Sequence, residues 1–300
     1  MASSAWTRRD FFRRTAAAGG LAVGSGLLFG ACSRVEEGGN VLARAREEGT
    51  IRVGIAGEVP YGFTQQGRVT GEAPEVAREV LRALGIEEVD AQQVEFDGLI
   101  GGLNARQFDI VAAGMNIRPD RCEQAAFSIP DYSAPTAFLV PRGNPEQVTR
   151  FEGFEAKGLR LAVQSGTVEQ DYARSIGVPD DLVLVVGDQV GMLQAVVNNR
   201  VYAASLTNIS LNRLVDDNPD AQVEVTEGFN PIIDGEEVIS AGGFVFRKSD
   251  ADLRNAFNSE LRRIHENGGW LEIVRPFGFT EENLPPVDLT TEELCEAPRG

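Results

Sequence analysis

The sequence has little histidine, little cysteine and too few positive charges to balance its acidic residues. Its 300 residues include one His and three Cys, and 28 Lys and Arg stand against 45 Asp and Glu, so the formal net charge is −17 at pH 7. This acidity argues against nucleic acid as a partner. The lone His265 falls in a charged helical stretch, where we expect it to be exposed. The cysteine spacing does not suggest a metal site, and we expect neither a metal nor a cofactor.

A hydrophobic run long enough to cross a membrane is also missing. The apolar, Gly- and Ala-rich stretch from Ala16 to Phe29 falls short of the ~20 residues that a spanning helix needs. It follows Arg8 and Arg9, which stand before two phenylalanines and match the twin-arginine export pattern. We therefore expect residues 1–31 to be a signal peptide that is removed on export.

The apolar stretch ends in Leu28-Phe29-Gly30-Ala31-Cys32, which resembles a lipoprotein box. Small residues give the peptidase access to the backbone there, and the Cys32 sulfur would carry the lipid. Residues 32–50 would then be the lipidated cysteine and a tether. The protein would lie outside the cytoplasm, in the periplasm or on the outer face of the cell membrane, and be held there by its lipid anchor. The alternative is cleavage near the same point with Cys32 as an ordinary thiol.

Two cysteines, Cys122 and Cys295, follow Cys32 in the chain. Disulfides persist outside the cytoplasm, so we expect these two residues to be bridged. The bridge would clip the C-terminal tail to the first lobe. Two isolated thiols are the alternative.

Strand and helix patterns alternate through the rest of the chain, which predicts an α/β protein. A short amphipathic helix precedes the first strand, and two extended segments interrupt the alternation. The expected strands are 51–56, 89–96, 108–114, 159–163, 182–186 and 202–206, the helices 74–84, 99–106, 168–176, 189–198 and 251–266, and the extended segments 138–140 and 243–247.

This order predicts two α/β lobes joined by two extended crossings. We assign residues 51–141 and 243–300 to lobe 1 and residues 142–242 to lobe 2. A ligand would bind in the cleft between the lobes, which is the geometry of a hinge-closing binding protein.

The stretch from Gly114 to Arg121 resembles the segment of polar amino-acid-binding proteins in which an arginine at a helix start grips a ligand carboxylate. A planar guanidinium can hold a carboxylate with two parallel hydrogen bonds. Across the cleft, Ser165-Gly166-Thr167 stands at a strand-to-helix junction, where backbone amides and a hydroxyl can bind an anion. A surface salt bridge and an ordinary helix cap are the alternatives, but the two together favour a binding site.

Amino-acid binders of this family usually follow the strand that corresponds to 202–206 with an aspartate that receives the α-ammonium group of the ligand. Here that position is Thr207. A neutral hydroxyl is a poor partner for a desolvated ammonium group, so an ordinary α-amino acid is disfavoured as the ligand.

A closer resemblance extends over nearly the whole mature chain. Its segments are Glu58 to Gly62, Val69 to Ala77, Arg121-Cys122, Ile233 to Gly235, Ala241 to Lys248, Pro276 to Thr280 and Leu289 to Cys295. They are similar to the ectoine- and hydroxyectoine-binding proteins of ABC transporters, which have the two-lobed type II periplasmic-binding-protein fold with a helix-flanked sheet in each lobe. The resemblance implies a monomeric receptor that captures a small zwitterion and delivers it to a permease with its ATPase.

Ectoine is a cyclic amidinium that bears a carboxylate, so its receptor needs an arginine, aromatic faces and an acceptor for ring N–H groups. The resemblance implies that Arg121 binds the carboxylate with help from Thr167. Tyr61 and Phe96 would be cage walls, with core packing as the alternative.

Two further positions belong to this predicted site. Glu58 would accept a hydrogen bond from the amidinium. Asn116 stands where a third aromatic wall is expected, and it could hydrogen-bond the ring or a hydroxyl group instead.

A transport receptor needs no catalytic residue, and we expect none. The runner-up within the transport class is a receptor for polar amino acids. The enzymatic alternative is a cyclohexadienyl dehydratase, whose lobes the chain also resembles. Such an enzyme needs an acid near the leaving group, and Glu58 is the only cleft acid that the sequence nominates.

Overall fold

The structure is a computed structural model that describes residues 40–296. The expected signal peptide and Cys32 lie outside the described residues. Helix α1 (Val41–Glu48) ends at Gly49, which takes the left-handed conformation just before the first strand. Within residues 40–296, no helix is long and apolar enough to cross a membrane. The same residues contain no group of His, Cys, Asp and Glu placed to hold a metal ion.

The first sheet combines parallel strands with strands that run the other way. Its three parallel strands are β4 (Glu88–Gln93), β1 (Thr50–Ile55) and β5 (Ile110–Asn116), and β15 (Ala241–Phe246) pairs antiparallel with β5 and with the short strands β6 (Ala126–Phe127) and β7 (Tyr132–Ser133). The chain therefore returns to the first sheet after building the second.

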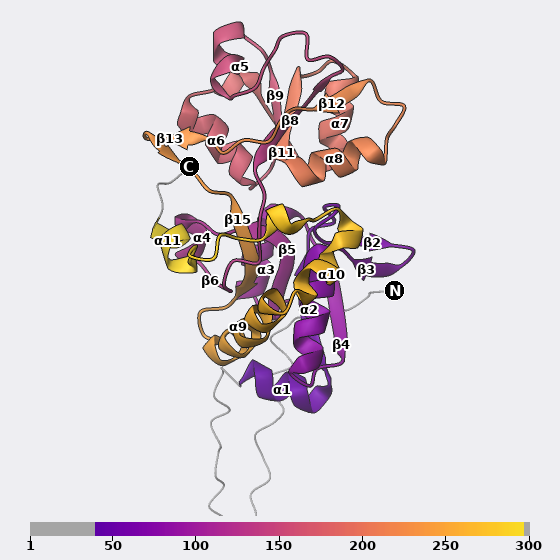
Figure 1. Cartoon of the computed structure of the whole chain (residues 1–300), viewed down its shortest axis with the longest axis vertical. Helices are drawn as coiled ribbons and strands as arrows, with labels where there is room; N and C mark the ends of the chain where they lie inside the picture. The colour runs from indigo at the N-terminus through magenta and orange to yellow at the C-terminus, as the bar shows by residue number, and fades with distance from the viewer. Residues whose placement is uncertain (1–39, 297–300) are drawn as a thin grey trace, which may run out of the picture. The chain divides into compact units, whose positions relative to one another are not determined.

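Side chains alternate along each strand, so both faces of this sheet carry apolar residues, and helices cover both faces. On β15, Phe244 and Phe246 join the core under α2 (Glu72–Ala83), α9 (Ala251–Glu266) and α10 (Gly269–Val274). Val245 points to the opposite core, which α3 (Leu99–Asn104) and α11 (Thr291–Glu296) complete (Figure 1).

The second sheet repeats the same plan. Its parallel strands are β10 (Val183–Val186), β9 (Leu161–Gln164) and β11 (Ala203–Thr207), and β8 (Thr136–Pro141) runs antiparallel to β11 and β12 (Val223–Val225). Phe138 and Val140 pack towards α5 (Glu152–Lys157) and α6 (Val168–Ile176). Ala137 and Leu139 pack towards α7 (Gln189–Val197) and α8 (Asn208–Asp216), on the other side in Figure 1.

The remaining elements are short. Two hairpins lie outside the main sheets, and a turn at Asp234-Gly235, where both residues have positive φ, closes the second. The hairpins are β2 (Phe63–Gln65) with β3 (Arg68–Thr70) and β13 (Ile232–Ile233) with β14 (Glu236–Glu237). One further α-helical turn is α4 (Pro119–Cys122), and the 3-10 turns are η2 (Phe96–Gly98), η3 (Asp180–Leu182), η4 (Arg275–Phe277) and η5 (Glu281–Asn283).

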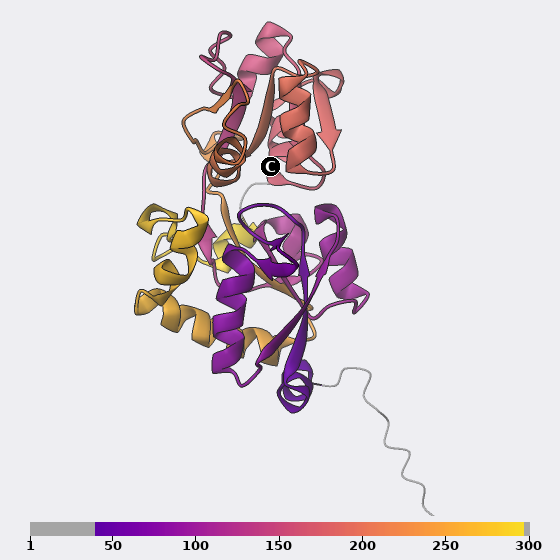
Figure 2. The ribbon, with the colours of Figure 1, turned by 90° about the vertical axis from the view of Figure 1, so that its right-hand side faces the viewer.

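The chain crosses between the two sheets twice (Figure 2), and a backbone hydrogen bond joins the two crossings. The amide of Ala134 in the first crossing donates to the carbonyl of Ser240 in the second, at 3.0 Å. Residues up to 141 were expected to belong to lobe 1. Strand β8 instead pairs within the second sheet, so the first crossing lies just before Thr136.

His265 is more enclosed than the sequence analysis predicted, since its side chain is only 16 % exposed. Its Nε2 lies 3.2 Å from Oδ1 of the buried Asp131, and the indole N–H of Trp270 donates to the same oxygen at 2.9 Å. Burial and the neighbouring Asp131 hold the pKa of the Glu72 carboxyl well above its usual range.

A disulfide joins Cys122 to Cys295, as the sequence analysis expected, with their Cα atoms 5.8 Å apart. It ties α11 to α4. The segment 284–296, here called the C-terminal strap, is also held where the Thr291 hydroxyl donates to the Ser128 carbonyl at 2.7 Å and where Leu294 is buried.

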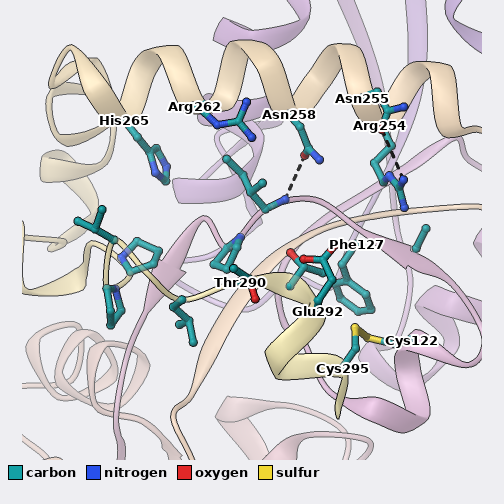
Figure 3. Close-up of a pocket in the computed structure, with 18 of the residues that line it drawn as sticks. Cys122, Phe127, Arg254, Asn255, Asn258, Arg262, His265, Thr290, Glu292 and Cys295 are labelled. Carbon is teal, nitrogen blue, oxygen red and sulfur yellow. Dashed lines mark hydrogen bonds between the residues drawn. A yellow bond between two sulfur atoms is a disulfide. The ribbon is translucent and has the colours of Figure 1, made fainter. Parts of the chain in front are cut away.

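A cavity of about 1050 Å³ lies between the C-terminal strap and α9. Figure 3 shows Arg254, Arg262 and His265 on the α9 side and the disulfide at the opposite wall. None of the predicted ligand-binding residues lines this cavity, so the candidate site has to be found elsewhere.

Candidate ligand-binding site

The loop after β1 carries Glu58 and Tyr61, and it folds back on itself. Residues 58 and 62 form an isolated bridge, and the amide of Gly57 donates to the carbonyl of Gly62 at 2.8 Å. The ring of Tyr61 rests on Gly114 of β5, where a Cβ atom would lie only 2.2 Å from its Cδ1. A glycine at 114 is thus what allows this aromatic ring to lie against the strand.

Both side chains of the loop reach the second lobe at the start of α8. The Ser210 hydroxyl donates to Glu58 Oε1 at 2.6 Å, and the Tyr61 hydroxyl donates to Thr207 Oγ1 at 3.2 Å. Thr207 is the N-cap of α8, and its Oγ1 also accepts from the amide of Ser210. In this structure the two lobes therefore meet directly through the predicted site residues.

Glu58 is 8 % exposed, and burial raises the pKa of its carboxyl to about 7. The hydrogen bond from Ser210 opposes this rise, and the negative charge of Glu169 adds to it. A cation placed beside Glu58 would restore its ionised form, which suits the predicted role of this carboxyl as an acceptor.

Arg121 lies in α4 and is 4 % exposed. Its guanidinium donates to the Asn116 carbonyl at 2.8 Å and, across the cleft, to the Gly166 carbonyl at 2.6 Å. It also stacks over Phe96, with 5.4 Å between Cζ and the ring centroid. Burial lowers its pKa to about 10, so the group remains charged at neutral pH. The bonds to the two carbonyls use two of the five N–H donors of the guanidinium.

Aromatic side chains lie beside Arg121 and in the loop after β1, and the groups that they contact differ. Phe96 at the start of η2 faces Arg121. The ring of Tyr61 packs against Tyr132 and Phe279, with centroids 4.8 and 5.6 Å apart. Phe96 thus lies beside the predicted carboxylate clamp, whereas Tyr61 is integrated into an aromatic cluster.

Both the nitrogen and the oxygen of the Asn116 side-chain amide form hydrogen bonds with other side chains of the protein. Its Nδ2 donates to Ser240 Oγ at 2.5 Å, and its Oδ1 accepts from the Tyr132 hydroxyl at 3.1 Å. Ser240 belongs to the second crossing. Contact between Asn116 and a ligand therefore stays a prediction, since in this structure the side chain links the crossing to Tyr132.

The predicted anion-binding loop approaches the first lobe at two points. Besides the Gly166 carbonyl that accepts from Arg121, the Ser165 hydroxyl donates to Asp97 Oδ2 at 2.8 Å. The hydroxyl of Thr167 donates to the Gln164 carbonyl at 3.0 Å. Thr167 is the N-cap residue of α6, so the loop does lead into a helix N-terminus.

Sequence reasoning missed three polar residues of the cleft: Tyr132, Glu169 and Ser210. Glu169 in the first turn of α6 is only 2 % exposed, and its Oε1 accepts from the Thr136 hydroxyl at 3.1 Å. Burial raises the pKa of its carboxyl. An acidic residue at a helix start is usual on the surface, so the sequence pattern carried no sign of its burial.

An ion pair and a small cavity mark one edge of the cleft. Arg118 of the first lobe contacts Asp171 of α6, and also pairs with Asp120 at 2.8 Å. A cavity of about 420 Å³ extends from Asn116 and Arg118 past Tyr172 to the C-terminal strap. This edge, like the centre of the cleft, is built from both lobes.

Solved structures with this fold include binding proteins for small solutes. The crystal structure of EhuB in complex with hydroxyectoine has a TM-score of 0.79 and is 33% identical, covering 86% of this chain and 99% of the other. The ancestral amino acid-binding protein AncCDT-1, a precursor of cyclohexadienyl dehydratase, has a TM-score of 0.68 at 25% identity, covering 79% and 98%. The two-lobed type II periplasmic-binding fold and the resemblance to ectoine-binding proteins are confirmed.

Curated relatives point to the same class of protein. A probable amino-acid ABC transporter periplasmic-binding protein of Sinorhizobium fredii is 34% identical over 266 residues, which cover 86% of this chain and 87% of the relative. Residues 51–280 match the family described as bacterial extracellular solute-binding proteins, family 3. The protein is therefore an extracytoplasmic solute-binding protein of an amino-acid-type ABC transporter, and it belongs to that family.

Proposed function

We propose that this receptor captures ectoine or hydroxyectoine between its lobes and delivers it to the permease of an ABC importer. The observation that carries the proposal is that Glu58, Phe96 and Arg121 are buried where the lobes meet: Glu58 accepts from Ser210, and Arg121 donates to Gly166 and stacks over Phe96. A carboxyl, an aromatic face and a guanidinium are the groups that a cyclic amidinium carboxylate needs. The structural likeness to EhuB with bound hydroxyectoine supports this choice of ligand.

The position of Thr207 supports the same choice over an ordinary α-amino acid. Its Oγ1 accepts from both Tyr61 and the amide of Ser210, so it is occupied as a neutral helix cap. The second candidate is a receptor for polar amino acids, which the curated relative from Sinorhizobium fredii favours. In that case Glu58 or Glu169 would have to receive the ammonium group that Thr207 cannot.

Calorimetric titration of the purified protein separates the two candidates. We expect ectoine or hydroxyectoine to bind at least roughly tenfold more tightly than arginine, glutamine or other polar amino acids, a gap of about 1.4 kcal/mol. Tighter binding of any amino acid in the panel would overturn the ectoine assignment and leave the receptor class intact. Neither outcome requires a catalytic residue, and we propose none.

A lipid anchor at Cys32 is the second part of the proposal, together with a monomeric state. The sequence Leu28 to Ala31 before Cys32 supports it. We expect the exported full-length protein to fractionate with membranes. Cys32→Ser should be released or remain unprocessed, while the neighbouring Ser33→Ala should behave as wild type. Membrane association that survives Cys32→Ser would contradict the anchor.

A further inference from the structure

An ion pair joins the two lobes through residues that are not among the predicted ligand-binding residues. Arg118 is the N-cap of α4 in the first lobe, and its guanidinium donates to Asp171 Oδ2 of α6 in the second. By contrast, the pair of Arg213 with Asp217 on α8 stays within the second lobe. Because Arg118 and Asp171 lie on opposite lobes, their contact requires the lobes to be closed.

Each partner of this pair is also held by a second ion pair within its own lobe. Asp120 pairs with Arg118 through N–O distances of 2.8 and 2.9 Å, and Arg174 donates to Asp171 at 3.1 Å. The charges therefore alternate in sign along one network: Arg174, Asp171, Arg118 and Asp120. A side chain that is already ordered loses less conformational entropy when it forms a further contact, so a network stabilises more than an isolated surface pair.

The pair between the lobes is only partly buried. The side chains of Arg118 and Asp171 are 21 % and 18 % exposed. Arg118 also lines the cavity of about 420 Å³ at this edge of the cleft. Arg121 at the centre is 4 % exposed, so dissolved ions screen its contacts less. Salt should therefore weaken the contact of Arg118 with Asp171 more than the contacts of Arg121.

We propose that Arg118 and Asp171 are positioning residues that hold the closed lobes around the ligand and set the rate of its release. The pair acts on closure and makes no contact with the ligand. Since the contact is lost when the lobes separate, its removal should speed dissociation and leave the association rate nearly unchanged. The inference rests on the proposed receptor function, and it applies to any ligand around which the lobes close.

Stopped-flow fluorescence with ectoine and with glutamine measures both rates. For Asp171→Asn and for Arg118→Gln we expect dissociation to become about three- to tenfold faster, with an association rate within about twofold of wild type. The double variant should release ligand at most about twofold faster than the faster single variant, because both substitutions remove the same contact. The matched control is Arg213→Gln, which breaks an ion pair within the second lobe and should release ligand at the wild-type rate.

The salt dependence of release separates a contact between the lobes from a general loss of structure. When NaCl is raised from about 0.05 to about 0.5 M, we expect dissociation from the wild type to become roughly two- to fivefold faster. The same change should have little effect on Asp171→Asn, which has already lost the ion pair. Ectoine and glutamine carry no net charge, so screening of long-range attraction to the ligand cannot produce this difference.

The outcomes separate this inference from the proposed function. Release at the wild-type rate from a folded Asp171→Asn protein would overturn the role of the pair and leave the receptor function standing. Effects of the two substitutions that simply multiply in the double variant would also overturn it. Binding of glutamine but not of ectoine would overturn the ligand assignment, and the rates with glutamine would then decide on the pair. Thermal unfolding verifies that each variant is folded, and if Arg118→Gln is not, Arg118→Lys takes its place with a smaller expected effect.

Discussion

Replacing both Cys122 and Cys295 with serine is expected to lower the free energy of unfolding by about 2 to 5 kcal/mol. The bridge closes a long loop, since the two residues are 173 positions apart. It also holds the C-terminal strap, which contributes Leu294 to the core beside α3. At the usual sensitivity of domains of this size, the melting temperature should fall by roughly 4 to 20 °C.

The measurement is thermal unfolding of the wild type and the double variant, each with and without a reductant. The reductant should destabilise the wild type by a similar amount and leave the double variant unchanged. Limited proteolysis of the double variant should cut within 284–296 before the rest of the chain. If the oxidised wild type instead shows two titratable thiols besides Cys32, the bridge is absent in solution.

Local signals in the sequence were enough to predict the elements with clear ends. The helices expected at 168–176 and 251–266 match α6 and α9. Thr167 and Gly177 mark the two ends of α6, with Gly177 in the left-handed conformation. Helix α8 was not among the expected helices, although Thr207 caps its first turn and accepts from the amide of Ser210.

The sheet to which a strand belongs cannot be predicted from the strand alone. Strand β8 is buried along Thr136–Val140, which suits the centre of either sheet. Its pairing with β11 and β12 depends on where the chain crosses between the sheets, which is at Ala134 and Pro135. For this reason the lobe boundary in the structure differs from the predicted one, although the strand itself was expected.

The candidate site was predictable where a residue type matches a chemical role. Arg121 and Glu58 were predicted from the resemblance of their segments to those of known binding proteins, with the chemical roles that a zwitterion requires, and both are buried in the structure. The contacts of Glu58 with Ser210 and of Tyr61 with Thr207 join residues 152 and 146 positions apart. Such pairs arise only when the lobes approach, so no local pattern reveals them.

Burial also decides which polar residues matter in the cleft. Glu169 and Asp171 are two positions apart in the same helical turn, yet Glu169 is buried against Thr136 while Asp171 pairs with Arg118 at the edge. From the sequence alone the two cannot be told apart, since each is an acidic residue near a helix N-terminus. Only the packing of α6 against β8 and α4 separates a cleft charge from an edge charge.

Arg121→Ala is expected to weaken ligand binding at least about thirtyfold. The variant would leave the ligand carboxylate unpaired in a closed cleft, and losing one partner of a desolvated charge pair costs about 2 to 5 kcal/mol. It would also remove the bond to the Gly166 carbonyl, one of the contacts that join the lobes. Arg121→Lys should rescue binding only in part, because an ammonium group cannot supply the two-pronged geometry of a guanidinium.

Titration calorimetry of the wild type and both variants with ectoine and hydroxyectoine, at one salt concentration, measures this loss. Thermal unfolding checks that each variant is folded, which matters because Arg121 also donates to the Asn116 carbonyl within its own lobe. Arg82→Ala is the matched control, since Arg82 lies in the same lobe, is 58 % exposed and pairs only with Glu79 among the contacts found in residues 40–296. It should bind as the wild type does. A folded Arg121→Ala protein that binds within threefold of wild type would show that the carboxylate is held elsewhere, and the amide groups of the loop at Ser165 to Thr167 would then be the site to test.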